Sequence, residues 1–169
     1  YLQSRYQMYR QVYFHKAVAS GEAVLIALLD RASERARAGA LPGVELGSPL
    51  GRILAGQGQS LDLADYLGLD DTVLVGAFHA WSRCDDAVLR DLSERLLFRR
   101  LFKAFEIAAD DTRDLEVELR IEAARGVLAE AGIDPRYYLR FSQSADTPYR
   151  PYSPRASKPG QTIWIEETN

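Results

Sequence analysis

The feature that most constrains the fold of this chain is a helix-forming pattern running from about residue 3 to about residue 38. Such a helix would span roughly 54 Å at 1.5 Å per residue, which is long for a globular protein. From Gly21 onward the pattern is rich in Ala and Leu, with Arg and Glu at solvent-facing positions. Gly21 predicts either a close crossing or a kink. Gly39, with Pro42 and Gly43 beyond it, predicts where the helix ends.

Four long side chains share one stripe on the first half of this helix. They are Arg5, Tyr9, Tyr13 and Lys16. At 100° per residue they fall within roughly 80° of one another on a helical wheel. Arginine offers a fork of donors that suits phosphate, lysine offers a mobile charge, and a tyrosine ring can stack on a base or sugar. The stripe could therefore hold a nucleotide phosphate. The alternative is an amphipathic helix whose long polar side chains cover its neighbours while their tips stay in water.

Local start and stop signals divide the next part of the chain into shorter helices. The predicted helices cover about 50–55 after Ser48, 61–67 after Ser60, 72–83 after Asp70, 87–105 after Asp85 or Asp86, and 112–131 before Gly132. The cations Arg99, Arg100 and Lys103 fall near the end of the fourth of these helices. Cations are favoured there by the helix dipole, so we prefer a structural role for them.

The character of the chain changes at Asp134-Pro135. An aromatic and roughly alternating run over 136–142 predicts a strand. A proline-rich linker follows, and the segment 162–166 predicts a second strand.

We therefore predict a mostly α-helical (α+β) fold in two parts. Residues 1–132 would form a helical body, and residues 133–169 a small β and proline-rich appendage.

Composition narrows the possible functions. The 169 residues are enough for one domain with a real core. The net charge of −3 argues against a general nucleic-acid or membrane-surface binder, and no apolar run is long enough to span a membrane. Cys84 is the single cysteine, which suits a reducing compartment, and we expect a cytoplasmic location. The chain begins at Tyr1 without a clear N-cap, so we expect it to be a piece of a longer protein.

Several constellations that often carry chemistry are absent from the sequence. The two histidines, His15 and His79, do not form a His-x-x-x-His pattern, and there is no cysteine cluster, so no transition-metal site is predicted. His79 stands next to Phe78, in a mostly apolar stretch, and we expect it to be buried or half-buried. Asp70 and Asp71 are interpreted as a helix cap and a first-turn acid rather than as paired catalytic carboxylates.

Three stretches, taken in order, carry a resemblance to a known family. The first is Arg5-x-x-x-Tyr9-x-x-x-Tyr13-x-His15-Lys16. The second is YLGLDDTVLVGAFHAW with the following helix ending in ERLLFRRLFK, and the third is YYLRFSQSADTPYRPYSP leading to IWIE. Together they cover nearly all of the chain. They resemble the C-terminal half of HD-domain phosphohydrolases, in the branch of the dGTP triphosphohydrolase-like proteins and the animal SAM-and-HD-domain dNTPase.

The resemblance implies roles for five residues. An arginine that matches Arg5 contacts the triphosphate, and a tyrosine that matches Tyr13 packs on the deoxyribose and helps to reject a 2′-hydroxyl. Tyr9 matches a position that faces the same pocket. His15 and Lys16 match positions near a second nucleotide at a subunit contact in allosteric members. The resemblance also implies a deoxynucleoside triphosphate ligand and a homo-oligomer.

The residues that hold the metal in that family are not present in this sequence. The resemblance places them upstream of Tyr1 and implies a divalent metal (Mn, Mg, Fe or Zn) in the intact parent. We therefore predict no catalytic residue, metal ligand or cofactor within this chain, and no hydrolysis by the chain alone. The parent would hydrolyse dNTPs to deoxynucleoside and triphosphate. One alternative is a non-catalytic helical domain that binds a nucleotide or a protein, and another is an HD-fold enzyme with a different phosphate substrate.

Overall fold

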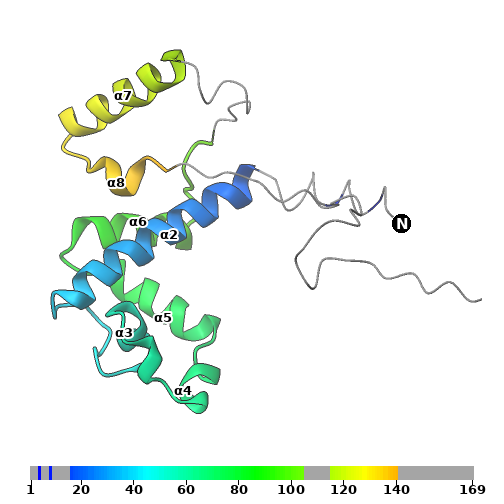
Figure 1. Cartoon of the computed structure of the whole chain (residues 1–169), viewed down its shortest axis with the longest axis vertical. Coiled ribbons are helices and arrows are strands. Elements are labelled where there is room, and N and C mark those ends of the chain that lie inside the picture. Colours follow the sequence, from blue (N-terminus) through cyan, green and yellow to red (C-terminus); the bar gives the residue numbers. More distant parts are fainter. Residues whose placement is uncertain (1–3, 5–7, 9–15, 105–114, 141–169) are drawn as a thin grey trace, which may run out of the picture.

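A long helix forms the centre of the molecule, and shorter helices pack on both sides of it (Figure 1). The computed structural model describes residues 4, 8, 16–104 and 115–140. The central helix, α2, covers Lys16–Arg37. Its buried residues recur at the three- and four-residue spacing of one helix face. They are Ser20, Val24, Ala27, Leu28, Ala32 and Ala36.

The other elements are short, and no strand occurs in the part of the chain that the structure describes. They are α3 (Pro49–Leu54), the 3-10 turn η2 (Gly58–Ser60), α4 (Leu63–Leu67), α5 (Asp71–Trp81), α6 (Ala87–Leu97), α7 (Leu115–Glu130) and α8 (Pro135–Tyr138). Helices α3, α6 and α8 pack on α2, while α5 packs on α6 and α7 packs on α8. The predicted mostly helical fold is confirmed.

The core lies between α2, α5 and α6, around Trp81. This side chain is fully buried, and its Nε1 donates a hydrogen bond to the Pro42 carbonyl at 2.9 Å. The Phe78 ring lies 5.9 Å from it, centroid to centroid. Leu28 of α2 and Leu92 of α6 are also fully buried. Removal of these apolar surfaces from water stabilises the packing of the three helices.

Most helix starts follow the predicted caps. Side-chain oxygens of Ser48, Asp70 and Asp86 accept backbone N–H groups in the first turns of α3, α5 and α6. These three starts are confirmed. Ser60 is not a cap, because it lies within η2 and the Asp62 carboxylate caps α4 instead.

The predicted ends of α2 and α7 at glycine residues are also confirmed. Gly39 and Gly132 follow these helices with φ values of +74° and +72°, in the left-handed region that glycine favours. The helix α2 continues through Gly21. A Cβ added at Gly21 would lie 3.9 Å from Leu101 Cδ1, an ordinary van der Waals distance, so the predicted close helix crossing is not present among the described residues.

The predicted end of α6 is wrong. We expected helix to about residue 105, but α6 ends at Leu97 and Phe98 is its C-cap. The backbone N–H of Arg100 turns back to the Arg95 carbonyl at 2.9 Å, and residues 100–104 have no regular structure. The residues of this segment are good helix formers, so tertiary contacts of the segment with α2 override their propensity.

The predicted strand over 136–142 is wrong within the described residues, because α8 occupies Pro135–Tyr138. Asp134 caps this helix, and proline stands at the first helical position, where its fixed φ and missing N–H are tolerated. Residues 141–169, which include the second predicted strand, lie outside the described residues. The division of the chain at residue 132 stays a prediction.

His79 was expected to be buried or half-buried, and it is exposed. The buried face of α5 is formed by Ala77, Phe78 and Trp81. At 100° per residue, His79 points about 150° away from the centre of that face. None of the described helices has the length and the apolar character needed to cross a membrane.

Candidate functional site

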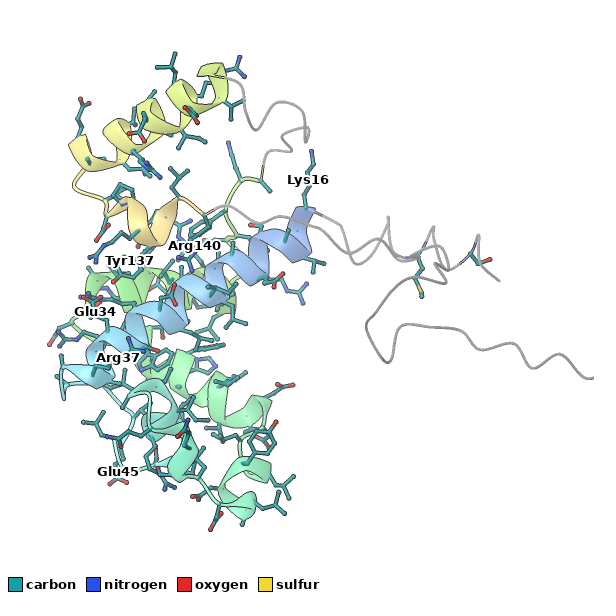
Figure 2. The ribbon with its side chains drawn as sticks, viewed as in Figure 1. Lys16, Glu34, Arg37, Glu45, Tyr137 and Arg140 are labelled. Atoms are coloured by element: carbon teal, nitrogen blue, oxygen red, sulfur yellow. The ribbon has the colours of Figure 1, made fainter. Side chains whose placement is uncertain are left out.

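Among the predicted site residues, Lys16 is the one that the structure describes. Arg5, Tyr9, Tyr13 and His15 lie outside the described residues, so their roles stay predictions. Lys16 is the first residue of α2, and its side chain is exposed. Figure 2 shows it projecting from this end of the helix. The candidate site therefore consists of Lys16 and the residues around this end of α2.

The chain that follows α6 lies against the same end of α2. The hydroxyl of Ser20, which is only 4% exposed, donates a hydrogen bond to the Phe102 carbonyl at 2.6 Å. Next to it, the bare Cα of Gly21 faces the Leu101 side chain. Lys16 stands one helical turn before Ser20 on the same face of α2. Lys103 directly follows Phe102 in the chain, so its backbone is next to this contact.

An unusual turn directs the chain from α6 to this contact. Arg99 has φ of +53°, and it is the one residue other than glycine with a positive φ among those that the structure describes. Its N–H donates to the Leu96 carbonyl at 3.3 Å, next to the bond from Arg100 to Arg95. These two bonds form a Schellman motif, in which glycine usually holds the position of Arg99. An arginine at this position therefore adopts a backbone conformation that is costly for it.

Three exposed cations stand on the two segments that form this contact, Lys16 on α2 and Arg99 and Lys103 on the segment after α6, and this set is termed the basic junction. The side chains of Arg99 and Lys103 form no ion pair with any residue that the structure describes. The first described turn of α2 carries no acid. Arg100 is different, because it is bound to Glu94 at 2.6 Å. Guanidinium and ammonium groups arranged in this way favour binding of a phosphate group.

Sequence reasoning missed two members of the basic junction. Arg99 and Lys103 were interpreted as structural cations at a helix end, a role that the structure gives to Arg100. The signal that could have found them is the density of charge, since three of the five residues in 99–103 are cations. Their placement beside Lys16 depends on where α6 ends, which local sequence signals did not show.

A second polar cluster ties α2 to α6 and α8. Arg31 donates to both carboxylate oxygens of Asp86, with a shortest distance of 2.7 Å, and the Tyr137 hydroxyl donates to Glu34 (Figure 2). Burial raises the pKa of Asp86, but hydrogen bonds from Arg31 and Leu89 outweigh it, so the pKa is lowered overall. Burial and the bond to Glu34 raise the pKa of Tyr137. At neutral pH the groups are paired in complementary protonation states, so the cluster is structural.

A hollow of about 490 Å³ lies near the C-terminal end of α2. Its lining residues are Arg35, Pro42, Arg83, Cys84, Asp85 and Asp86. Along the helix, Arg35 stands roughly 28 Å from Lys16, so the hollow is separate from the basic junction. Its two arginines are balanced by two aspartates, and Arg35 Nε lies 3.6 Å from Asp86 Oδ2. This balance of charge gives the hollow little preference for an anion.

Comparison with known proteins gives two informative similarities, although no protein-family model matches the chain. The uncharacterized protein YwfO of Bacillus subtilis is 38% identical over 154 residues, which cover 91% of this chain and 34% of that protein. The crystal structure of a phosphohydrolase from Bacteroides thetaiotaomicron has a TM-score of 0.57 at 29% identity, and the match covers 78% of this chain and 33% of that chain. This chain therefore spans about a third of the length of each.

These similarities support the predicted resemblance to a phosphohydrolase in general, and not its narrower dNTPase branch. The phosphohydrolase of Bacteroides thetaiotaomicron matches this chain in fold. The two chains are also similar in sequence over the matched part. The chain is thus similar, in sequence and in structure, to one part of a phosphohydrolase.

Proposed function

We propose that this chain is the nucleotide-binding helical part of a metal-dependent phosphohydrolase that cleaves deoxynucleoside triphosphates to deoxynucleoside and triphosphate. The observation that carries the proposal is the likeness to the phosphohydrolase of Bacteroides thetaiotaomicron. Support comes from the basic junction, because two of its exposed cations, Arg99 and Lys103, form no ion pair with the described residues, and such cations suit a polyphosphate. The part of the relatives' length that this chain does not span would hold the catalytic centre.

In this proposal the stripe before α2 binds the substrate. Arg5 offsets charge on the triphosphate with its fork of donors. Tyr13 packs on the deoxyribose, where a 2′-hydroxyl would lack room, and Tyr9 faces the same pocket. Since the substrate has more negative charge when its phosphates separate from the nucleoside, a fixed guanidinium also stabilises the charge that develops.

The basic junction, with the neighbouring His15, binds the phosphates of a second nucleotide. Lys16 would reach these phosphates from α2, and Arg99 and Lys103 from the segment after α6. Because Lys16 belongs both to the stripe and to the junction, a ligand at the junction would hold a side chain that the substrate stripe shares. The second nucleotide would then act as an activator.

The required divalent metal is not assigned to this chain. Among the residues that the structure describes, no three His, Cys, Asp or Glu side chains are placed to hold a metal ion. The described residues thus do not fit a metal centre, and we derive no step through it here. Their part in the proposed function is to bind and orient phosphate groups.

The test is triphosphate release from each dNTP and rNTP by the full-length protein that carries this chain, with Mn²⁺ or Mg²⁺. We expect release from dNTPs and little from rNTPs. Arg5→Ala should lower the rate on the order of 10- to 100-fold through loss of a charged hydrogen bond. Arg37→Ala, an exposed arginine at the other end of α2, is the matched control and should not change the rate.

Two outcomes would contradict the proposal. The metal-loaded protein could be inert towards every nucleotide even with dGTP or GTP added as activator. If such a protein still bound nucleotides, the non-catalytic binding domain would be the better description. Alternatively, equal cleavage of ribonucleotides and deoxyribonucleotides would remove the proposed role of Tyr13 and favour a different phosphate substrate.

A further inference from the structure

Arg95 lies in a compact cluster that joins α6, the segment 99–103 and α8. Its guanidinium carbon is 5.5 Å from the centroid of the Phe102 ring and 5.8 Å from that of the Tyr138 ring. The two ring centroids are 6.0 Å apart, and their planes meet at 52°. The guanidinium therefore faces one aromatic ring from the segment and one from α8, both within the range of cation–π attraction.

Asp91 and Arg100 fix the orientation of this guanidinium. Asp91 accepts from Arg95 Nε at 2.7 Å, and its carboxylate also acts on the hydroxyl of Tyr138. Burial first, and then the Asp91 carboxylate, raise the pKa of Tyr138, so its hydroxyl keeps its proton. Arg95 Nη1 points to the Arg100 carbonyl at 3.4 Å. The side chain thus has hydrogen-bond partners at Nε and Nη1 and two aromatic rings near its guanidinium, which restrain its orientation.

The cluster holds the segment that carries two cations of the basic junction. Phe102 presents its ring to Arg95 and its carbonyl to Ser20 of α2. Arg95 therefore contacts the segment at two places, the Arg100 carbonyl and the Phe102 ring. Arg99 and Lys103 directly flank these two places in the sequence, so their backbone positions are set by the cluster.

We propose that Arg95 is a positioning residue, which through Phe102 and Tyr138 holds Arg99 and Lys103 beside Lys16 for joint binding of phosphate. The inference rests on the proposed function, in which the basic junction binds phosphate groups. Arg95 itself is not assigned to the phosphate, because its guanidinium pairs with Asp91 and lies close to the Phe102 and Tyr138 rings. Its planar fork is what matters, and a lysine would keep the charge without the fork or the flat face.

The test measures binding of inorganic tripolyphosphate to the full-length protein by isothermal titration calorimetry. Arg95→Lys and Tyr138→Leu should each weaken binding about five- to tenfold, the loss of one cation–π contact that fixes the site. Tyr138→Phe keeps the ring and should bind within about twofold of the wild type.

The chain offers a matched control in Arg31→Lys. Arg31 also pairs with an aspartate and lies over a tyrosine ring, 5.7 Å from the Tyr137 centroid, but far from the basic junction. This variant loses the same fork next to the same helix, α8. Its binding of tripolyphosphate should stay within about twofold of the wild type, whatever its thermal stability.

A double-mutant cycle separates positioning from general loosening. When Arg99 and Lys103 are both replaced by alanine, adding Arg95→Lys should weaken binding by less than about twofold, since the groups it positions are gone. A full additional loss in that background would overturn the inference. Normal binding by Arg95→Lys alone would also overturn the inference. If Lys103→Ala were impaired in that case, the proposed function would still stand. Normal binding by both Lys16→Ala and Lys103→Ala would remove the proposed role of the junction and the inference together.

Discussion

At the scale of single residues, Arg99 combines an unfavourable backbone with an exposed charge. Its φ of +53° costs a residue with a Cβ about 1 kcal/mol relative to glycine. Arg99→Gly should therefore raise the free energy of unfolding by about 1 kcal/mol, whereas Arg99→Ala, which keeps the Cβ, should not. Urea unfolding followed by circular dichroism compares the two. If Arg99→Gly were no more stable than Arg99→Ala, the strained turn would be disproved.

The same two variants should both bind tripolyphosphate less tightly, because each removes the guanidinium. A substitution that stabilises the protein and weakens its binding would show that the backbone cost at Arg99 is tolerated for the sake of its side chain.

Asp86 is a residue whose ionisation supports the fold. Its side chain is 7% exposed and binds Arg31, and its pKa is lowered in the folded state. A lowered pKa gives stability that is present above the usual value of about 3.9 and is lost as pH falls through the folded value. Asp86→Asn should lower the free energy of unfolding by about 2 kcal/mol near neutral pH, and the difference from the wild type should shrink below about pH 4.

Unfolding in urea at several pH values measures this difference. Asp30→Asn is the control, because Asp30 pairs with Arg140 at 2.6 Å but is 55% exposed, and exposed pairs contribute little. A deficit in Asp86→Asn that stayed constant down to about pH 3 would show that ionisation of the carboxylate does not contribute to stability.

At the scale of elements, α8 anchors α7 to the rest of the molecule. Helix α8 packs on α2 through Tyr137, which is 5% exposed, and α7 packs on α8. Tyr137→Ala should cost about 3–4 kcal/mol through loss of a buried ring. Amide hydrogen exchange should then speed up in α7 and α8 together while α5 stays protected.

The matched control for this prediction is Tyr66→Ala, since Tyr66 on α4 is 66% exposed. It should leave exchange in α7 unchanged. If Tyr137→Ala accelerated exchange in α8 but not in α7, then α7 would be held by contacts other than those with α8.

The same element shows how far local sequence reasoning reaches. Caps at Ser48, Asp70 and Asp86 were predictable, because a cap is a contact within four residues. The strand predicted over 136–142 failed because alternation of aromatic residues was given more weight than the Asp134 cap and the proline after it. The end of α6 was not predictable locally, since it depends on the contact of Phe102 with Ser20, which are 82 residues apart.

At the scale of the whole molecule, α2 connects two charged regions of different character. The Arg31–Asp86 end is balanced and buried, so it contributes to the fold. The basic junction at the other end is exposed, and its Arg99 and Lys103 form no ion pair with the described residues, so these two cations are available to an anion. Of the candidate site, the sequence identified Lys16 and its helix, and the structure added Arg99 and Lys103, because a junction between segments distant in sequence has no local signature.

This asymmetry predicts where a polyphosphate stabilises the protein. A ligand that binds only the folded state adds about 2.7 kcal/mol to the free energy of unfolding at a hundred times its Kd. Tripolyphosphate should therefore raise the midpoint of urea unfolding of the full-length protein, and Lys103→Ala should remove most of that rise. Salt near 1 M should also reduce it, since exposed charges are screened over about 3 Å at that concentration. If Lys103→Ala kept the full rise while Arg83→Ala lost it, the anion would bind in the hollow beside Arg35, and the basic junction would not be the phosphate site.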